Sequence, residues 1–335
     1  MTSPSESLAV AITVLNEGES IRRLLDSLIQ QTRRPSAIII CDGGSRDDTV
    51  AIIESYRDRL PLRAIIAPGC NISQGRNRAI AAADADLIAV TDAGVALADD
   101  WLERVTAPLF ADPSRIVSAG FFQPDPRTVF EAALAATTLP LVEEIDPAKF
   151  LPSSRSVAFR KSAWERVGGY PEWLDYGEDL VFDLRLKALD PDFAFAPDAI
   201  VRFRPRPSVR AFFKQYYLYA RGDGKADLWR KRHAIRYLTY GAALPLIIIA
   251  AWALHPLFAL VGLLGGAVYI ASPIRRMPAN LRWLRESGAQ VSPAAIVCAL
   301  AWIPLLRAIG DIAKMLGYPV GRRWRLRHAP PNWRR

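Results

Sequence analysis

The sequence predicts an α/β fold with a mostly parallel, doubly wound sheet in its N-terminal part, followed by membrane helices. Short apolar segments alternate with helical segments over residues 8–91, as in a sheet with helices on both faces. Two later stretches, each about long enough to cross a bilayer, contain no Asp, Glu, Lys or Arg. Residues 1–201 carry 20 Lys and Arg against 30 Asp and Glu, whereas residues 202–335 carry 23 against 4. The net charge of +9 therefore combines an acidic part with a basic part.

The predicted strands are short, nearly unbroken apolar runs that contain β-branched residues. Such runs are typical of strands buried on both faces, because helices cover both sides of a parallel sheet. We place the strands at Leu8–Leu15, Ala37–Cys41, Leu62–Ala67, Leu87–Thr91 and, further along the chain, Phe193–Ala196.

Helical segments separate these strands. Apolar residues recur at helical spacing from Ile21 to Leu28, and Pro35 prevents further extension. The segment Ser45–Asp48 resembles a helix N-cap followed by acidic residues. The other predicted helices are Thr49–Tyr56, Ser73–Ala83 and Asp179–Leu189. Strand–helix alternation with short turns predicts a doubly wound sheet.

After Trp101 the alternation loosens. The segments Pro124–Pro126 and Asp146–Arg155 are expected to be loops. The Pro- and Arg-rich segment Arg202–Arg210 is expected to end the soluble domain, and an aromatic, basic helix over Phe212–Ala220 follows it.

Three apolar segments lie in the basic part of the chain. Leu238–Leu254 and Pro256–Ile274 are joined by a short turn, and basic residues flank both outer ends. The positive-inside rule therefore predicts a hairpin with both ends in the cytoplasm. Pro293–Leu306 is shorter and has basic residues on both sides, which favours an interfacial or re-entrant helix over a third crossing. Buried core helices are the remaining alternative for all three segments.

These observations divide the chain into five parts. They are an α/β domain at 1–210, an amphipathic basic linker helix at 211–236, a transmembrane helical hairpin at 237–274, an interfacial or third membrane helix at 291–316 and a basic tail at 317–335. The N-terminal segment carries no basic leader, so we expect the α/β domain to stay in the cytoplasm. The three cysteines form no CxxC pair, which fits a reducing compartment and predicts neither a disulfide framework nor a zinc site.

Several functional classes lack their motifs. There is no GxGxxG after the first strand, no GxxxxGK[ST] and no GxSxG, which disfavours dinucleotide-binding, P-loop and α/β-hydrolase proteins. His233, His255 and His328 all lie outside the α/β part, so a Ser-His-Asp enzyme would have no base there. The basic charge is not accompanied by a nucleic-acid-binding motif, so no nucleic-acid partner is expected.

Polar residues follow three of the predicted strands. Asn16 and Glu17 come after the first strand, Asp42 after the second and Asp92 after the fourth. A single acidic residue in such a place is often a helix cap or a turn former. Open α/β sheets, however, bind ligands outside the carboxyl ends of their strands, and three such clusters predict a ligand site there.

Three blocks of sequence resemble the family 2 glycosyltransferases, in the order that the family has them. The first is AITVLNEGESIRRLLDSLIQQTRRPSAIIICDGGSRDDT, with Asn-Glu after a strand and Asp-Gly-Ser-x-Asp-x-Thr after the next. The second is GCNISQGRNRAIAAADADLIAVTDAG, and the third, RKSAWERVGGYPEWLDYGEDLVFDLRLK, ends the acceptor-side block in Glu-Asp. The resemblance covers most of residues 8–190 and implies a GT-A fold ahead of the C-terminal membrane region.

The resemblance also implies roles for individual residues. Asp179 would be the catalytic base, with Glu178 beside it in Gly-Glu-Asp, and Asp92 would lie at the ribose and diphosphate and bind the metal. The residues implied to bind the nucleotide sugar are Glu17, Asp42, Arg76, Asn77 and Asp92. Asn16, after the first strand, and Arg221, which could pair with the diphosphate, are further candidates for nucleotide-sugar binding. For Arg221, a place in a flexible basic turn before the membrane is the alternative. Ser153-Ser154-Arg155 either contacts donor or acceptor or forms a surface loop, and Trp164, Trp173 and Tyr176 either line an acceptor pocket or pack in the core.

The chemistry of glycosyl transfer is consistent with these roles. A carboxylate can take the proton of the acceptor hydroxyl, and a divalent cation or arginines can stabilise the departing nucleoside diphosphate. Where the family has Asp-x-Asp, this chain has Asp92-Ala93-Gly94, so the second carboxylate is missing. Asp92 could still hold Mg²⁺ or Mn²⁺ together with diphosphate oxygens and water. The Gln-x-x-Arg-Trp motif of processive members is also absent.

The sequence thus predicts an inverting glycosyltransferase. It would move a sugar from a nucleotide-sugar donor to a glycan or membrane-associated, lipid-linked acceptor at the cytoplasmic membrane face, in contact with membrane lipids. The alternative is a catalytically inactive membrane scaffold of the same fold. A nucleotidyltransferase on a related sheet would need an early Gly-rich basic loop, which is absent.

Overall fold

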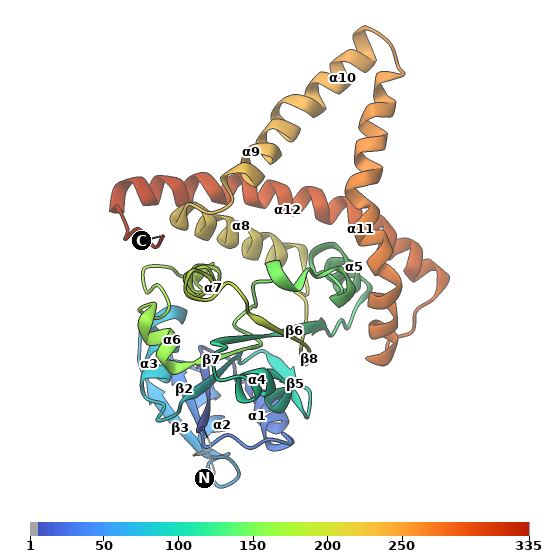
Figure 1. Ribbon diagram of the computed structural model, residues 1–335. Coiled ribbons are helices and arrows are strands. Elements are labelled where there is room, and N and C mark those ends of the chain that lie inside the picture. Colours follow the sequence, from blue (N-terminus) through green and yellow to red (C-terminus); the bar gives the residue numbers. More distant parts are fainter. Residues whose placement is uncertain (1–5, 335) are drawn as a thin grey trace. The chain divides into compact units, whose positions relative to one another are not determined.

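The computed structural model describes residues 6–334, and the contacts within it divide the chain into two compact units (Figure 1). The sheet unit comprises Met1–Gln123, Val142–Phe203 and Pro331–Arg335. The helical unit comprises Pro124–Leu141 and Arg204–Pro330. Each unit is described by itself.

The sheet unit is built on an eight-stranded mixed sheet. Its strands are β1 Leu8–Val14, β2 Ala37–Asp42, β3 Leu62–Ile66, β4 Leu87–Asp92, β5 Val95–Leu97, β6 Val117–Pro124, β7 Val157–Arg160 and β8 Ala194–Phe203. They lie in the order β3-β2-β1-β4-β7-β6-β8-β5. Strands β1 to β4 run parallel, and the pairs β4–β7, β6–β7 and β5–β8 are antiparallel. The predicted α/β class with a mostly parallel core is confirmed.

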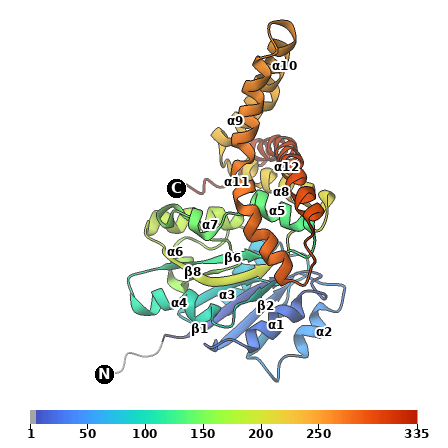
Figure 2. The same cartoon turned by 90° about the vertical axis from the view of Figure 1, so that its right-hand side faces the viewer.

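Two helical layers cover the two faces of this sheet (Figure 2). Helices α1 Ile21–Ile29, α2 Thr49–Glu54 and α4 Trp101–Ala111 share a core with Val10 and Ile12 of β1. Helices α3 Ile72–Ala81, α6 Lys161–Arg166 and α7 Glu178–Leu189 share a core with Ala9 and Ala11 of the same strand. Successive strand residues point to opposite faces, so an unbroken apolar strand fills both layers. Each fully buried isoleucine contributes roughly 1.5–3 kcal/mol. Two 3₁₀ turns, η1 Val142–Glu144 and η2 Pro147–Lys149, complete the unit.

Two boundaries differ from the prediction. Strand β8 extends to Phe203, whereas the sequence predicted a strand ending at Ala196. Buried Ala199 and Val201 alternate with exposed Asp198 and Arg202, and this period of two continues the strand past Pro197. Part of the segment expected to end the soluble domain is therefore sheet.

Helix α2 starts at Thr49, as predicted, but it ends at Glu54 instead of Tyr56. The residue before its first turn is Asp48, whose side chain makes no capping hydrogen bond. Ser45 does not cap the helix; its hydroxyl instead donates to the Asp42 carboxylate in the turn after β2. The acidic segment ahead of α2 thus forms a turn around Asp42.

The helical unit contains the apolar segments. Its elements are α5 Val129–Thr138, α8 Val209–Ala226, α9 Arg230–Leu238, the π-helical turn η3 Thr239–Ala243, α10 Leu244–Ala253, α11 Phe258–Glu286 and α12 Pro293–His328. Side chains of α5, α8, α11 and α12 form one apolar core, which includes Phe212, Met277 and Ile303. In Figure 1, α8 and α12 lie side by side, and α10 and α11 meet at a turn.

Helices α8 and α12 pack backbone to backbone. A Cβ atom on Gly317 would lie 2.1 Å from the carbonyl oxygen of Tyr217, and one on Gly321 would lie 2.0 Å from that of Arg221. On α8, a Cβ atom on Gly224 would lie 2.4 Å from the Tyr318 carbonyl oxygen. Small residues four apart permit this approach, as in membrane helix pairs.

Three helical segments are long and apolar enough to cross a membrane. They are Arg230–Ala253, which joins α9, η3 and α10, then Phe258–Glu286 and Pro293–His328. Many of their apolar side chains are exposed, among them Trp252 at 89% and Val268 at 78%. The third apolar segment was predicted to be short, but it belongs to a helix of 36 residues. By length and composition it qualifies as a third crossing, so the interfacial and spanning alternatives both stay open.

Candidate active site

The register of the parallel strands brings two of the predicted carboxylates to one edge of the sheet. Strand β1 lies between β2 and β4; Val14 pairs with Asp42, and Thr13 pairs with Asp92. Neighbouring strands are about 4.8 Å apart, so the two aspartate backbones lie roughly 10 Å apart across β1. Both stand at carboxyl ends of strands, the edge where open α/β sheets bind ligands.

Asp42 organises the turn after β2. Its Oδ2 accepts the backbone N–H groups of Gly44 and Ser45, both at 2.9 Å, and its Oδ1 accepts the Ser45 hydroxyl. Gly44 has a φ of +97°, which favours glycine, and a Cβ atom there would lie 3.0 Å from Pro68 Cα. An ionised carboxylate offers about four acceptor positions, so Asp42 keeps capacity for a ligand N–H or hydroxyl.

Asn16 and Glu17 join this turn from the end of β1. Asn16 has a φ of +54°, its N–H donates to Ser45 Oγ at 2.8 Å, and its Oδ1 accepts the Arg46 N–H at 2.9 Å. The Glu17 N–H donates to Thr49 Oγ1 at 2.8 Å, and its carboxylate accepts the Ser20 hydroxyl. The structure therefore brings Asn16, Glu17 and Asp42 into one network.

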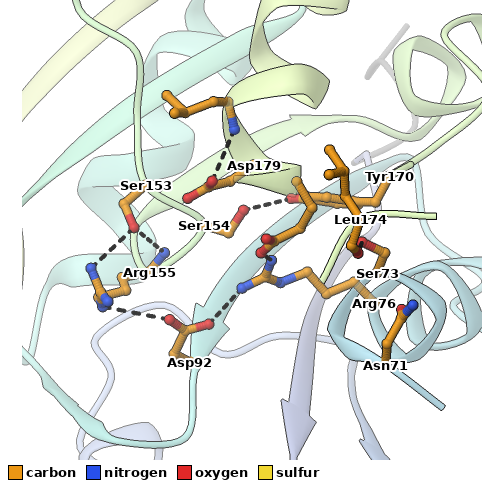
Figure 3. Close-up of polar contacts among 12 residues, drawn as sticks. Asn71, Ser73, Arg76, Asp92, Ser153, Ser154, Arg155, Tyr170, Leu174 and Asp179 are labelled. Carbon is orange, nitrogen blue, oxygen red and sulfur yellow. Dashed lines mark hydrogen bonds and ion pairs between the residues drawn. The ribbon is translucent and has the colours of Figure 1, made fainter. Parts of the chain in front are cut away.

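A buried arginine links β4 to α7 (Figure 3). The Arg76 side chain is 3% exposed; its NH2 donates to Asp92 Oδ1 at 2.8 Å and its NH1 donates to Glu178 Oε1 at 2.5 Å. The guanidinium carbon lies 5.3 Å from the ring centre of Tyr170. Residues from three distant parts of the chain thus meet at one cation, and Glu178 and Asp179 are neighbours in the first turn of α7.

Charge and burial set the protonation states here. Burial opposes ionisation of Asp92, but Arg76 and Arg155 outweigh it and lower the pKa of that carboxyl. Burial, together with the neighbouring Asp179, raises the pKa of Glu178 to about 7, although Arg76 acts in the opposite direction. Burial also disfavours the charged form of Arg76, yet Asp92 and Glu178 raise its pKa above the ordinary value. The site holds a permanent cation beside one ionised and one readily protonated carboxyl.

Arg155 adds a second cation at Asp92. Its Nε lies 3.5 Å from Asp92 Oδ2, and its guanidinium carbon lies 4.7 Å from the Phe203 ring centre. The neighbouring Ser154 hydroxyl is 2.9 Å from the Tyr170 hydroxyl, and both side chains are buried. Of the two alternatives for Ser153-Ser154-Arg155, the structure favours placement at the site over a surface loop.

Asp179 lies half-buried at the start of α7, where its Oδ1 accepts the Leu180 N–H at 2.9 Å. One turn later is Asp183, a residue the sequence reasoning missed. It is 2% exposed, its Oδ2 has no hydrogen-bond partner, and burial followed by repulsion from Asp179 raises its pKa well above the usual range. Its spacing of four residues from Asp179, which puts both on one helix face, was the available signal.

Side chains of α3 hold the segment that leads into α7. Asn71 Nδ2 donates to the Glu172 carbonyl at 2.7 Å, and the Ser73 hydroxyl donates to the Leu174 carbonyl at 3.0 Å. Asn77 Nδ2 donates to the Tyr170 carbonyl at 2.9 Å. Gly177, with a φ of +75°, then turns the chain into α7. The same helix that carries Arg76 therefore fixes the position of Glu178 and Asp179.

Not every predicted residue joins the cluster. Asn77 Oδ1 accepts the Trp164 Nε1–H at 3.1 Å and the Tyr170 N–H at 2.8 Å, so its amide is engaged by the segment before α7. Consecutive helix residues point about 100° apart, which separates Asn77 from Arg76. Arg221 lies within α8 of the helical unit, so the alternative of a flexible basic turn is wrong. The half-buried Trp164 packs partly against the core of the sheet unit.

A resident metal centre is not built into the described residues 6–334, where no group of three His, Cys, Asp or Glu side chains is arranged to hold an ion. Asp92 fits as a single carboxylate ligand, because Mg²⁺ is often bound by one or two carboxylates plus substrate phosphates. A Cβ atom on Gly94 would meet nothing within 4 Å. The space for a second carboxylate thus exists, but the side chain does not.

The fold resembles solved structures. A mannosyltransferase from Pyrobaculum calidifontis, solved in complex with GDP-Man and Mn²⁺, has a TM-score of 0.55 and 17% sequence identity, over 97% of this chain and 88% of that one. Two sequence relatives are an O-antigen chain rhamnosyltransferase of Salmonella typhimurium and a glycosyltransferase of Haloferax volcanii. The first is 25% identical over 63% of this chain and 70% of its own length. The second is 25% identical over 68% and 76%.

Two glycosyltransferase families match successive parts of the chain. Glycosyl transferase family 2 matches residues 9–161, which include Asp42, Arg76 and Asp92. Glycosyl transferase family group 2 matches residues 147–308, which include Glu178 and Asp179. Together they span the sheet edge, the start of α7 and the apolar segments. The chain is a glycosyltransferase and belongs to family 2, with a GT-A fold.

Proposed function

We propose that the chain catalyses inverting transfer of a sugar from a nucleotide-sugar donor to a lipid-linked or glycan acceptor at a membrane. The observation that carries this proposal is the buried Arg76, which ties Asp92 at the end of β4 to Glu178 beside Asp179. Arg76 therefore links the carboxylate expected at the donor diphosphate, Asp92, to the residue next to the carboxylate expected at the acceptor, Asp179. An inactive scaffold would not need this buried charge arrangement, which is costly to maintain.

The donor would lie along the sheet edge. Asp42, Asn16 and Glu17 would face the nucleoside, because their turn presents carboxylate and amide groups that suit base and ribose hydrogen bonds. Arg155 would face the diphosphate, since its guanidinium lies beside Asp92. A guanidinium in that place can donate charge-assisted hydrogen bonds to phosphate oxygens. We propose that Arg221 adds a further contact to the diphosphate, and that Asn77 acts indirectly, by holding the segment before α7.

Asp179 would be the base. Its carboxylate takes the proton of the acceptor hydroxyl, the acceptor oxygen forms a bond to the anomeric carbon, and the bond from that carbon to the diphosphate oxygen breaks. The nucleoside diphosphate leaves with the electron pair. Attack opposite the leaving group inverts the anomeric centre. Arg76 and Arg155 stabilise the charge that develops on the diphosphate side.

A divalent cation, when bound, would supply further positive charge to the departing diphosphate. Asp92 would be its protein ligand, and diphosphate oxygens and water would complete its coordination. The Mn²⁺ bound by the Pyrobaculum calidifontis mannosyltransferase supports this part of the proposal.

We propose a multi-pass membrane protein with the catalytic domain in the cytoplasm. The three candidate spans and the basic residues at their ends support this orientation. The proposed division is a GT-A domain at 1–210, a linker helix at 211–236, a transmembrane hairpin at 237–274, a third membrane or interfacial helix at 291–316 and a basic tail at 317–335. The similarity to an O-antigen chain rhamnosyltransferase of Salmonella typhimurium supports a cell-envelope glycan or lipid-linked acceptor.

A donor screen tests the proposal. The full chain in detergent would be offered UDP-, GDP- and dTDP-sugars with and without Mn²⁺, and donor hydrolysis, transfer and binding would be measured. Asp179→Asn should retain donor binding and lose turnover by about 10²–10⁴-fold, the usual contribution of a general base. Asp198→Asn, at an exposed position in β8, is the matched control and should leave turnover unchanged. Equal turnover in wild type and Asp179→Asn would contradict the role of Asp179 as the catalytic base. If wild type bound no donor, the inactive membrane scaffold would be favoured.

A further inference from the structure

A polar cluster lies where the apolar segments of the helical unit converge. Arg236 of α9, Tyr240 of η3, Tyr269 of α11 and Asp311 of α12 belong to the three candidate spans. Ionisable residues in membrane helices are costly, so they are usually paired and mark substrate or ion sites. In Figure 1, α9 and α11 both reach α12.

The carboxylates at this cluster, Asp311 and the nearby Asp223 of α8, already have hydrogen-bond donors. Asp311 is buried; its Oδ1 accepts Arg236 Nε–H at 2.6 Å, and its Oδ2 accepts the hydroxyls of Tyr240 and Tyr269. Arg236 NH1 lies 3.2 Å from His233 Nδ1, and His233 Nε2 lies 3.1 Å from Asp223 Oδ2. Since Arg236 can only donate, Nδ1 of His233 accepts and its Nε2–H donates to Asp223.

Two cations on α12 are left without an anion. The Arg307 guanidinium carbon lies 4.6 Å from the Tyr269 ring centre, and Lys314 Nζ lies 4.8 Å from the Tyr216 ring centre. Among the residues the structure describes, neither cation forms an ion pair or hydrogen bond, and the Nε of Arg307 is buried without a partner. A guanidinium normally engages its donors, so this arrangement calls for an anionic ligand.

The two cations are placed for one phosphate-bearing group. They are seven residues apart, which is two helical turns on the same face and about 10 Å along the axis, with Asp311 between them. The three cations Arg236, Arg307 and Lys314 outnumber the two carboxylates Asp223 and Asp311, which leaves one net positive charge. Long flexible Arg and Lys side chains from both ends of this interval can reach a phosphate between them, with the aromatic rings flanking it.

The position of Arg307 and Lys314 relative to the apolar segments favours a lipid as the anionic ligand. Arg236 precedes the first uncharged stretch and Tyr269 lies near the end of the second, so both stand at the two ends of the predicted hairpin, which share one membrane face. Arg307 of α12 stacks on Tyr269, so it lies at the headgroup level of the membrane that the hairpin enters. Exposed apolar residues continue from it, including Leu264 at 68% and Leu305 at 53%, and they suit an acyl or prenyl chain.

We propose that Arg307 and Lys314 bind the phosphate of a lipid-linked acceptor, with its hydrocarbon chain along α11 and α12. The proposal rests on the proposed transfer to a lipid-linked acceptor and names the group that recognises it. Basic sites between membrane helices are a known way to hold lipid headgroups. Asp311, Arg236 and the two tyrosines form the frame that keeps the three helices together around the site.

Lipid binding by the full chain in detergent tests the proposal. Native mass spectrometry would measure binding of a polyprenyl monophosphate, the matching polyprenol without phosphate, dioleoylphosphatidylglycerol and inorganic phosphate. The polyprenyl phosphate should bind at least tenfold more tightly than the polyprenol. Arg307→Gln with Lys314→Gln should remove that difference. Arg323→Gln with Arg327→Gln, which removes two exposed charges from the same helix, should preserve it.

The outcomes are distinct. If the Arg323/Arg327 variant lost the preference for polyprenyl phosphate to the same extent, the lipid would be attracted non-specifically by positive charge, and the proposed site would be wrong. Tighter binding of phosphatidylglycerol than of polyprenyl phosphate would assign the site to bulk lipid, and equal affinity of inorganic phosphate would exclude a lipid ligand; both contradict the proposal. Thermal unfolding of each variant tests for a folding defect. If the double variant does not fold, the single Lys314→Gln variant replaces it in the binding measurement. Donor hydrolysis, measured in parallel, tests the proposed function separately from this site.

Discussion

Replacing Glu178 by Gln should change how the stability of the protein depends on pH. The folded Glu178 carboxyl has a pKa of about 7, against an ordinary value of 4.5, because it is buried beside Asp179. Between these two values the folded state holds a proton that the unfolded state has released. Stability therefore falls as pH rises through this range, and the contribution of the protonated carboxyl is complete only below pH 4.5.

The size of the effect follows from the shift. One pKa unit corresponds to about 1.4 kcal/mol, so the interval from 4.5 to about 7 corresponds to about 3 kcal/mol. Glutamine does not titrate and can accept the same hydrogen bond from Arg76. The free energy of unfolding of Glu178→Gln, minus that of wild type, should therefore become more positive by about 3 kcal/mol between pH 4.5 and pH 8.

Urea unfolding of the full chain in detergent, followed by tryptophan fluorescence at a series of pH values, measures this difference. Asp183, whose pKa is also raised, is present in both proteins and its contribution cancels if the sites are independent. The matched control is Glu172→Gln, which removes an exposed carboxylate from the segment before α7. A constant difference across the pH range would refute the assignment of Glu178 as a buried carboxyl that keeps its proton near neutral pH.

Further predictions follow from the same geometry. Arg155→Gln should weaken binding of a nucleoside diphosphate about 10–100-fold in calorimetry, because a charge-assisted hydrogen bond contributes about 1.5–3 kcal/mol; unchanged affinity would place the diphosphate elsewhere. Gly94→Asp should tighten Mn²⁺ binding at least tenfold in the donor complex, since the position is open, and titration of activity against Mn²⁺ checks this. Gly317→Leu should lower the unfolding temperature by several degrees, because its side chain collides with the Tyr217 carbonyl, whereas Gly266→Leu, at an open position, should not.

The first half of the sheet was predictable because its strands are buried on both faces. The apolar runs of β1 to β4 left few other interpretations, and the rule that ligands bind at carboxyl strand ends then selected Asp42 and Asp92. The end of β8 was not predictable in the same way. Pro197 interrupts its run, and the alternation that continues to Phe203 depends on pairing with β5.

The site residues divide along similar lines. Arg76 and Asp179 stand in motifs, but that Arg76 joins Asp92 to Glu178 depends on packing between α3 and α7, which a sequence does not display. For Arg155, the sequence left two alternatives open, a contact with donor or acceptor and a surface loop. A loop has no regular periodicity from which the direction of a side chain could be predicted. Asp183 was missed because burial of a carboxylate, not its identity, is what distinguishes it.

The sequence was sufficient to predict apolar helices of membrane-spanning length, but not the contacts that these helices make with one another. The two long stretches without charged residues predicted the helical hairpin. The extension of α12 to His328, in contrast, depends on its packing against α8 through Gly317 and Gly321. The ion pair between Arg236 and Asp311 joins residues 75 positions apart, so only the folded chain reveals that Arg307 and Lys314 are left unmatched.

A structure of the full chain with a bound nucleotide sugar would show whether the donor lies at the carboxyl edge of the sheet. We expect the nucleobase against the Asp42 turn, the diphosphate between Asp92 and Arg155, and the anomeric carbon facing Asp179. A nucleotide bound at any other place, with Arg76 and its two carboxylates untouched by the donor, would contradict this placement.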